Sequence, residues 1–319
     1  MTASDNSRPL VSVIVVAYNA EDTIARCLDS IVNQSLHDIQ LVIVNDGSSD
    51  DTQAVIDHYK AEDDRIVSVI QPNSGVSIAR QRGLDLASGL FSIFVDSDDW
   101  IEIEMLKTLY CKALQESSDI VVCDYIEERA SGPVYYKQKP KSDDSRVVLT
   151  QMFTELHGSL CNKLIRLSLY RNNRIRFIEG LNYREDECIL IGVLSTGCKV
   201  SYVNIGLYHY DKKNAGSISS LWHIRPVAEY KLFISTCTPF FNTPELQKVL
   251  NERIANIVKT LTYAPKSYYP ESRAFYRSNK SVFLNSNLPL RKKLFCVLYY
   301  NGFPVVASFR KLFQHHNGY

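Results

Sequence analysis

The sequence lacks the local signatures of several common protein classes. Its eight cysteines are dispersed and never form a C-x-x-C pair, which argues against a zinc site or a redox motif. No window reaches the roughly 18 uninterrupted apolar residues of a membrane-spanning helix. The 36 Lys and Arg residues are balanced by 35 Asp and Glu, and the net charge of +1 argues against a dedicated nucleic-acid-binding protein.

Two further features concern location. The N-terminal segment, residues 1–9, is polar and lacks the charged start and apolar stretch of a signal peptide. Several cysteines lie inside apolar patterns, where a free thiol behaves as a small hydrophobic side chain. From both features we expect a reduced, cytoplasmic protein.

The composition is that of a folded globular chain, with 45% hydrophobic and 22% charged residues in a length of 319. That length suits one large domain or two smaller ones. Because the pattern changes near residue 220, we predict one domain over 1–220 and a helical region over 221–319. A basic tail from about residue 266 has nine Lys or Arg and a single acid, Glu271, which indicates an anionic partner.

Short apolar runs alternate with helical patterns over the first 125 residues. The predicted strands are Val11–Val16, Leu41–Val44, Ile66–Ile70, Phe91–Val95 and Ile120–Cys123. Nearly continuous apolar strands between helices predict an α/β, Rossmann-like fold with a mostly parallel sheet and helices on both faces. Ligands bind such sheets beyond the carboxyl ends of the strands, and polar clusters follow the first, second and fourth strands.

After Asp124 the pattern is looser, and the expected elements are less regular. We expect an exposed polar excursion over Glu127–Arg146, helices over Met152–Tyr170 and Asp186–Leu194, and short strands at Val200–Val203 and Leu207–Tyr210. From Ile224 onward the pattern predicts helices, with an apolar stripe between Leu246 and Val258.

The strongest local signal is Asp96-Ser97-Asp98-Asp99, at the end of a predicted buried strand. Carboxylates there are costly unless a cation neutralises them, and an extended chain end would point Asp96 and Asp98 the same way. The pair can bind Mg²⁺ or Mn²⁺ and leave coordination positions for substrate phosphates. Alternatively, Asp98 or Asp99 caps a helix that begins near Ile101.

Two further motifs follow predicted strands. Asp46, in Asn45-Asp46-Gly47-Ser48, either shapes a turn or accepts a hydrogen bond from a base or a ribose. Residues 73–83 join a strand to a helix, and a helix start with Arg80 and Arg82 suits an anion such as a diphosphate. This segment is neither a Walker A loop nor a G-x-G-x-x-G motif, which excludes the mononucleotide-kinase and dinucleotide-binding classes.

In this order and spacing, these pieces resemble the family 2 glycosyltransferases with the GT-A fold. The similarity is dense from Ser12 to Trp100 and rests on four motifs, which are Val16-Ala17-Tyr18-Asn19, Asn45-Asp46-Gly47-Ser48, Asn73-x-Gly75-x-Ser77-x-Ala79-Arg80 and Asp96-Ser97-Asp98-Asp99. Farther on, three motifs resemble the family's acceptor-side half, namely Asn162-Lys163-Leu164, Arg184-Glu185-Asp186 and Tyr208-His209-Tyr210. Gln81 departs from the pattern, because many members have Asn there.

The resemblance implies an inverting, metal-dependent transferase that moves a sugar from a nucleotide-diphospho-sugar, usually a UDP-sugar, to a glycan or lipid-linked acceptor in surface polysaccharide synthesis. The residues implied at the base, the ribose and the nucleotide are Ala17, Tyr18, Glu21, Asp46 and Arg80. Asp96 would contact the ribose or the metal. Asp98 would hold the Mn²⁺ or Mg²⁺ that bridges the two phosphates.

The resemblance also implies that Asp186 is the catalytic base. It would take the proton of the acceptor hydroxyl as that oxygen attacks C1 of the sugar, in a single in-line displacement that inverts the anomeric centre. Independently, Glu185-Asp186-Glu187 precedes an apolar run at a predicted helix start, where the helix dipole favours carboxylates. The alternative is that Asp186 only caps this helix.

Four other residues have two interpretations each. His209 is either a further metal ligand or a half-buried histidine between two tyrosines. Lys163 and Arg184 pair either with phosphate or with Glu185. Trp100 either stacks on a sugar face or packs beneath the site. We place Glu185, Trp100 and Lys163 on the acceptor side.

The C-terminal tail has the basic clusters Arg291-Lys292-Lys293 and Arg310-Lys311 on either side of the mostly apolar run Leu294–Phe309. This arrangement suits a segment in an anionic membrane interface, which would place the protein peripherally on the inner face of the membrane, near a lipid-linked acceptor. Alternatively, the tail is a pair of helices docked on its own domain with its cations in water.

Two other functions compete with glycosyl transfer. A sugar nucleotidyltransferase would normally show a Gly-rich loop with Arg and Lys after the first strand, where this chain has Tyr18-Asn19-Ala20-Glu21. A non-catalytic nucleotide-sugar sensor or scaffold is the second alternative. The presence of Asp96, Asp98 and Asp186 argues for retained chemistry instead.

Overall fold

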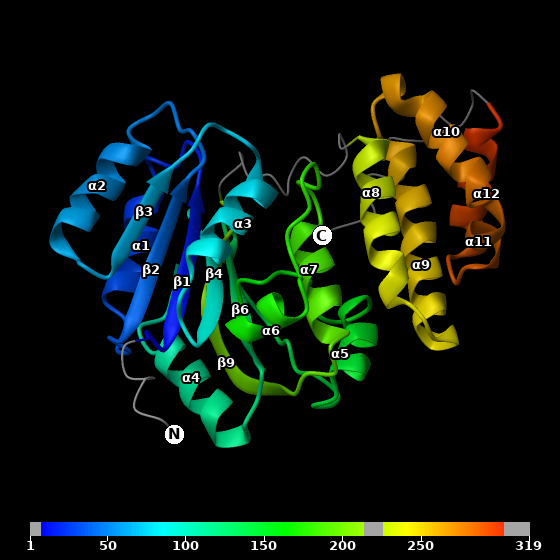
Figure 1. Ribbon diagram of the computed structural model, residues 1–319. Helices are drawn as coiled ribbons and strands as arrows, with labels where there is room; N and C mark the ends of the chain where they lie inside the picture. Colours follow the sequence, from blue (N-terminus) through cyan, green and yellow to red (C-terminus); the bar gives the residue numbers. More distant parts are fainter. Residues whose placement is uncertain (1–7, 214–225, 303–319) are drawn as a thin grey trace. The chain divides into compact units, whose positions relative to one another are not determined.

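The computed structural model describes residues 8–213 and 226–302. It divides into two compact units, residues 1–217 and residues 218–319. The first is an α/β unit and the second is helical, as the sequence predicts (Figure 1). The predicted boundary at residue 220 and the second basic cluster, Arg310-Lys311, lie outside the described residues.

Nine strands form one sheet within the described part of the chain. They are β1 (Val11–Ala17), β2 (Ile39–Asn45), β3 (Ile66–Ile70), β4 (Phe91–Asp96), β5 (Trp100–Ile101), β6 (Ile120–Arg129), β7 (Gly132–Tyr136), β8 (Lys163–Arg166) and β9 (Val200–Asp211). Their order is β3-β2-β1-β4-β8-β6-β9-β5, and β7 pairs with β6. The strands β3, β2, β1 and β4 are parallel, as are β6 and β9, whereas β8, β5 and β7 pair antiparallel with their neighbours.

The helices of the first unit connect these strands. They are α1 (Ile24–Val32), α2 (Thr52–Glu62), α3 (Val76–Leu86), α4 (Met105–Glu116), α5 (Ser145–Met152), α6 (Leu167–Asn172) and α7 (Glu185–Leu194). The helices α1 and α2 lie on one face of the parallel strands and α3 on the other (Figure 1). Helix α3 approaches β1 so closely that a Cβ on Gly83 would lie 2.4 Å from Cγ2 of Ile14, so only glycine fits.

The elements predicted for the first 125 residues are confirmed, but several predictions beyond them are wrong. The expected excursion over Glu127–Arg146 is instead the end of β6, the edge strand β7 and the start of α5. Strand β7 alternates half-buried and exposed residues, so it contains no apolar run to detect. The segment Met152–Tyr170 is not one helix, because the short strand β8 interrupts it.

The two short strands predicted at Val200–Val203 and Leu207–Tyr210 are one continuous strand, β9. Its pairing with β6 shifts register near Asp124, where Asn204 and Ile205 of β9 are exposed. This irregularity breaks the apolar pattern without breaking the strand.

The second unit consists of α8 (Val227–Cys237), α9 (Pro244–Thr260), α10 (Tyr269–Ser278), α11 (Lys280–Asn285) and α12 (Leu290–Tyr300), with 3₁₀ turns η2 (Thr238–Phe240), η3 (Leu261–Tyr263) and η4 (Lys266–Tyr268). The apolar stripe predicted on α9 is largely confirmed, since Leu246, Leu250, Ile254 and Val258 are buried. The Tyr300 hydroxyl donates to the carbonyl of Val258 (2.8 Å) and ties α12 to α9. None of the described helices has the length and apolar character needed to span a membrane.

Candidate active site

The polar clusters after the first, second and fourth strands meet at one edge of the sheet. In the parallel register Ala17 lies beside Asn45, and Val16 lies beside Asp96. The carboxyl ends of β1, β2 and β4 therefore converge, as a parallel sheet requires. Three loops, which the sequence separates by about 30 to 50 residues, border one site.

Asp46 holds the loop that precedes α3. Its carboxylate is buried and accepts hydrogen bonds from the side chain of Gln71 (2.8 Å) and from the amides of Ser74 (3.0 Å) and Gly75 (3.0 Å). Gly75 has a φ of 87°, which favours glycine, and a Cβ there would lie 2.7 Å from the Asn182 side chain. Asp46 thus shapes a turn, one of the two roles expected for it, and it lies directly after the carboxyl end of β2.

The loop after β1 is fastened to the loop after β2. The amide of Asp51 donates to the Glu21 carboxylate (2.8 Å), and the amide of Ser49 donates to the Asn19 side chain (2.9 Å). Ala17 is buried at the strand end, whereas the Tyr18 ring is 52% exposed. An aromatic ring left open beside buried strand ends is available to a flat ligand such as a base.

Asp96, Asp98 and Asp99 follow β4 in three different environments. Asp99 is buried and accepts hydrogen bonds from the Tyr208 hydroxyl and from the amide of Asp211 (2.8 Å). Asp98 is half-buried, and burial followed by the charge of Asp96 raises its pKa to about 6. The predicted alternative of a helix cap is wrong, because residues Trp100–Ile101 form β5 and α4 begins only at Met105.

This acidic cluster has the chemistry of a hard-cation site. Burial, followed by the charges of Asp96 and Asp98, raises the pKa of Asp99 well above its usual range. A divalent cation would remove that repulsion, and oxygen is the ligand that Mg²⁺ and Mn²⁺ take. In the described ranges, no three or more His, Cys, Asp or Glu side chains are arranged to hold a metal by themselves. Asp96 and Asp98 are the side chains of this cluster that could hold such a cation together with a ligand's phosphates.

Arg80 connects this cluster to the start of α7. Its guanidinium is 6% exposed and contacts Asp96 (2.7 Å), Glu185 (2.9 Å) and Asp186. The expectation that Arg80 lies near the nucleotide stays a prediction. Its contacts with Glu185 and Asp186 could not be expected from local spacing, since these residues follow it by 105 and 106 positions.

Asp186 lies in the first turn of α7, but it does not cap the helix. The N-cap is Arg184, which has no side-chain capping bond, and the other Asp186 oxygen accepts from the amide of Leu160 (3.2 Å) and the Ser159 hydroxyl (3.4 Å). Burial raises the pKa of Asp186 while Arg80 lowers it, and burial likewise raises the pKa of Glu185. The helix N-terminus favours both carboxylates.

Lys163 is an anchor beneath this carboxylate. It is 5% exposed, and its ammonium donates to the carbonyls of His157 (2.9 Å) and Ser159 (2.6 Å) and to the Asn162 side chain (2.6 Å). Burial lowers the pKa of Lys163 to about 8. Lys163 thus fixes the loop over residues 157–162, whose Ser159 and Leu160 hold Asp186. Glu185, one of the two partners expected for Lys163, is not among these contacts.

A second group of side chains surrounds Trp100. The indole stacks on His209, with ring centroids 5.0 Å apart, and the guanidinium of Arg26 lies 4.0 Å from the indole centroid. Both nitrogens of His209 lie 2.9 Å from carboxylates, Nδ1 from Glu128 and Nε2 from Glu102. This matches the packed histidine of the sequence analysis more closely than a metal ligand with a free nitrogen.

Arg26 and Asp211 belong to this group but could not be predicted from the sequence. Arg26 donates to the carbonyl of Asp98 (2.6 Å) and to the Asp211 carboxylate (2.8 Å), and it is the cation beside the acidic cluster on this side. The two-residue pairing of β5 with β9 brings these residues together. A two-residue strand has no periodicity, so the sequence contains no signal for it.

Residues 12–174 match the sequence profile described as Glycosyl transferase family 2. The chain belongs to glycosyl transferase family 2. The predicted GT-A fold is confirmed by likeness to a crystal structure of S. aureus TarS 1-349 in complex with UDP-GlcNAc, which has a TM-score of 0.75 and covers 97% of this chain and 93% of that one at 21% identity.

Curated relatives of this family 2 chain include two from Bacillus subtilis (strain 168). The putative glycosyltransferase EpsH is 34% identical over 212 residues, which are 63% of this chain and 60% of EpsH. The uncharacterized glycosyltransferase EpsJ is 31% identical over 222 residues, 67% of this chain and 64% of EpsJ. The match therefore spans less than two thirds of either relative.

Proposed function

We propose that this family 2 chain transfers a sugar from a nucleotide-diphospho-sugar to a hydroxyl of a glycan or lipid-linked acceptor, with inversion at the anomeric carbon. A UDP-sugar is the favoured donor, because TarS of the same fold was crystallised with UDP-GlcNAc. A role in surface polysaccharide synthesis is supported by relatives such as the poly(ribitol-phosphate) beta-glucosyltransferase of Bacillus spizizenii, 29% identical over 68% of this chain and 34% of that protein.

The observation that carries the proposal is the contact of Arg80 with both Asp96 and Asp186. One guanidinium joins a carboxylate of the donor-side cluster to the carboxylate proposed as the base. A donor held at Asp96 and an acceptor hydroxyl held at Asp186 would therefore lie close to one another. Holding the reactants together in this way can itself supply several kcal/mol of the barrier.

On the donor side, Tyr18 offers a face to the base, and Asp46 shapes the loop that would approach it. Asp98, with Asp96, would hold Mn²⁺ or Mg²⁺, which when bound supplies the positive charge that stabilises a departing diphosphate. A Mn²⁺ ion accompanies GDP-Man in a mannosyltransferase of similar fold from Pyrobaculum calidifontis, with a TM-score of 0.57 and 16% identity over 96% of this chain and 88% of that one.

On the acceptor side, Asp186 would take the proton of the attacking hydroxyl. A carboxylate whose pKa is raised by burial is a stronger base than an exposed one, and the Leu160 amide and Ser159 hydroxyl fix its orientation. Glu185 lies beside it on the same turn and would contact the acceptor. Lys163 supports the loop that holds Asp186 rather than the acceptor itself.

We also propose that the chain works at an anionic membrane surface on the cytoplasmic side. Support comes from α12, where Leu290 and Leu294 are 81% and 56% exposed beside the exposed Arg291. Apolar side chains next to basic ones suit a bilayer interface. Flotation with anionic vesicles is expected to fall when Leu290 and Leu294 are both changed to Ser, and to be unchanged in a control Leu284→Ser. Equal flotation of all three proteins would contradict this.

Ligand-dependent unfolding tests the donor site. We expect UDP to raise the melting temperature in the presence of Mn²⁺ and much less without it, since a ligand at 100 times its Kd adds about 2.7 kcal/mol. Asp98→Ala is expected to abolish the Mn²⁺-dependent part, whereas the control Asp57→Ala, on the exposed surface of α2, is expected to keep it. A UDP effect that is the same with and without Mn²⁺, or unchanged in Asp98→Ala, would refute the metal role.

A further inference from the structure

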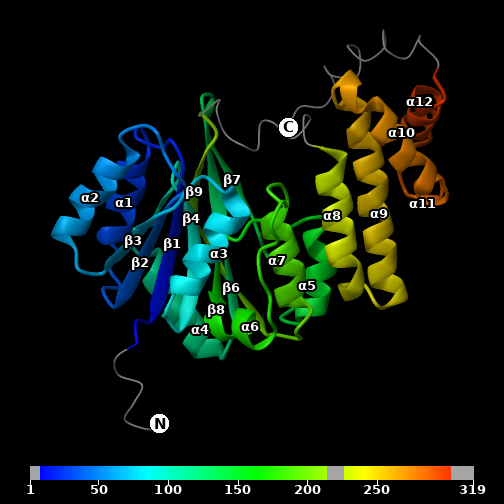
Figure 2. The same cartoon turned by 45° about the horizontal axis from the view of Figure 1, so that its top comes forward.

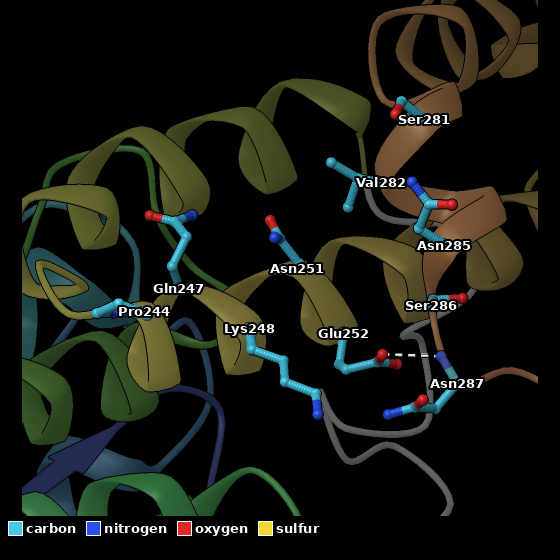
Figure 3. A pocket seen from close by; sticks show the side chains of 10 residues that line it. All are labelled: Pro244, Gln247, Lys248, Asn251, Glu252, Ser281, Val282, Asn285, Ser286 and Asn287. Carbon is cyan, nitrogen blue, oxygen red and sulfur yellow. Dashed lines mark hydrogen bonds between the residues drawn. The ribbon is translucent and has the colours of Figure 1, made fainter.

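A polar cavity lies between helices α9 and α11 of the helical unit. Its volume is about 400 Å³, and the residues that line it are Pro244, Gln247, Lys248, Asn251, Glu252, Ser281, Val282, Asn285, Ser286 and Asn287 (Figure 3). A water molecule needs roughly 10–15 Å³ of such space, and ligand sites commonly have about 300–1,000 Å³. The cavity is therefore large enough for a small organic ligand, and all of its residues lie outside the proposed catalytic site.

The cavity is formed by side chains one helical turn apart. Gln247 and Asn251 are four residues apart on α9, and Ser281 and Asn285 are four residues apart on α11. Residues at this spacing share one face of a helix. In Figure 3 the side chains of Asn251 and Val282 point toward one another from the two helices. Two helix faces thus present amides and a hydroxyl around one apolar side chain.

These amide groups are not used to hold the helices together. Within the lining, the backbone N–H of Asn287 donates a hydrogen bond to the Glu252 carboxylate (2.7 Å; dashed in Figure 3). Within residues 226–302, the side chains of Gln247, Asn251 and Asn285 have no hydrogen-bond partner. Each carboxamide has two N–H donors and an acceptor oxygen, which are available to whatever enters the cavity.

The charges of the lining indicate a neutral ligand. Lys248 is the one cation and Glu252 the one anion of the lining, so there is no excess of positive charge for a phosphate or a polyanion. Each sugar hydroxyl both donates and accepts a hydrogen bond, which matches carboxamides, and the C–H face of a sugar ring matches Val282. We propose that this cavity binds a neutral oligosaccharide.

The role of this cavity rests on the proposed function, because it concerns the acceptor glycan of the same transferase. An enzyme that extends a glycan gains affinity for a long acceptor if it holds a second part of the same chain away from the reacting end. Removal of the cavity should raise KM for long acceptors and leave KM for short acceptors unchanged.

The full-length protein labelled with ¹⁵N at asparagine provides a direct test. Maltotriose, cellotriose and triacetylchitotriose are titrated at millimolar concentration, and the side-chain amide signals of Asn251 and Asn285 are followed, each assigned by its substitution. We expect at least one trisaccharide to shift both signals in a saturable way, and Gln247→Leu to weaken that binding tenfold or more. Asn242→Ala, an exposed amide of the same unit outside the lining, is the control and should bind as the native protein does.

Two outcomes would overturn the proposal. One is that none of the three trisaccharides shifts either signal, and the other is that inorganic phosphate shifts them as strongly as the sugars do. Parallel UDP titrations with Mn²⁺ separate this proposal from the one above. Loss of sugar shifts with intact UDP binding would refute the cavity alone, whereas sugar shifts without UDP binding would refute the donor site alone.

Discussion

The two units of this chain differ most clearly in what they bury. The α/β unit buries charged side chains at the strand ends and in the loops behind them, including Asp46, Arg80, Asp99 and Lys163. In the described part of the helical unit, residues 226–302, the buried polar side chains are uncharged, namely Thr262, Ser272 and Ser286. Both units have apolar cores of ordinary kind, so the difference does not reflect a need for stability alone.

Burying a charged side chain costs desolvation free energy, so buried charges are usually paired or take part in binding or catalysis. In the α/β unit the pairing is collective, since one arginine contacts three carboxylates and one lysine contacts three oxygens. The comparison therefore supports placing the proposed chemistry in the first unit.

The largest expected effect is on turnover. Asp186→Asn keeps the shape of the side chain but removes the proton acceptor, and general base catalysis contributes roughly 10²–10⁴-fold. We expect a loss of that size in kcat, measured with a UDP-sugar donor, while Mn²⁺-dependent UDP binding stays near the native level. Native turnover in this variant would show that another group is the base.

The next effect is on folding. Arg80→Met leaves Asp96, Glu185 and Asp186 together without their shared cation, and breaking a buried ion pair costs roughly 3–5 kcal/mol. Urea denaturation should show this decrease in the free energy of unfolding. A decrease below about 1 kcal/mol would mean that the ion pairs of Arg80 do not stabilise the fold, and that the two units do not differ in this respect.

Lys163→Met tests the loop over residues 157–162, which holds Asp186, the proposed base. We expect kcat to fall on the order of 10- to 100-fold, the size expected when a catalytic group is displaced by about 1 Å. KM for the donor should change little, because the loop holds Asp186 and not the nucleotide-side residues. Lys163→Arg should recover part of the rate, since it keeps a cation with several donors. An unchanged kcat in the Met variant would contradict the anchoring role.

The lowered pKa of Lys163 should also make the stability of the protein depend on pH. Its pKa is lowered to about 8 in the folded chain, against roughly 10.4 in an unfolded one. Between these values the unfolded chain binds a proton that the folded chain has lost, so this residue makes the free energy of unfolding rise with pH. Its contribution is complete above the unfolded value and is lost as the pH falls through about 8. The difference between native protein and Lys163→Met, measured at pH 7 and pH 10, should show that slope.

The smallest effect is expected on the helical unit. Lys280 is exposed at the start of α11, and its removal in Lys280→Met should change the free energy of unfolding by no more than about 0.5 kcal/mol. This variant is the counterpart of Arg80→Met in the same denaturation experiment. If Lys280→Met lowered the free energy of unfolding by more than about 1 kcal/mol, the exposed Lys280 and the buried Arg80 would no longer differ in kind.

Local pattern was enough to predict the parallel half of the sheet. The strands β1 to β4 are nearly continuous apolar runs, and the polar residues at the ends of β2 and β4 indicated Asp46 and Asp96. The antiparallel strands were not predictable, because β8 has four residues, β5 has two and β7 is an edge strand. Short or one-sided strands depend on pairing partners that local sequence does not name.

The candidate site divides in the same way. The carboxylates Asp96, Asp98 and Asp186 were found from their positions at strand and helix ends. Lys163 was noticed, but its contacts depend on the path of residues 157–162, which no spacing encodes. Arg26 and Asp211 are 185 positions apart and were missed for that reason.

The long sequence separation between Arg80 and two of its partners also affects when the site can form during synthesis. During synthesis, Glu185 and Asp186 follow Arg80 by 105 and 106 residues, and ribosomes add roughly 5–20 residues per second. A growing polypeptide therefore waits roughly 5–20 s between exposing this arginine and receiving its distant acidic partners. The loops after β1, β2 and β4 can order early, but Asp186, the proposed base, is in place only when α7 has been synthesised, so a half-made chain lacks part of the proposed active site.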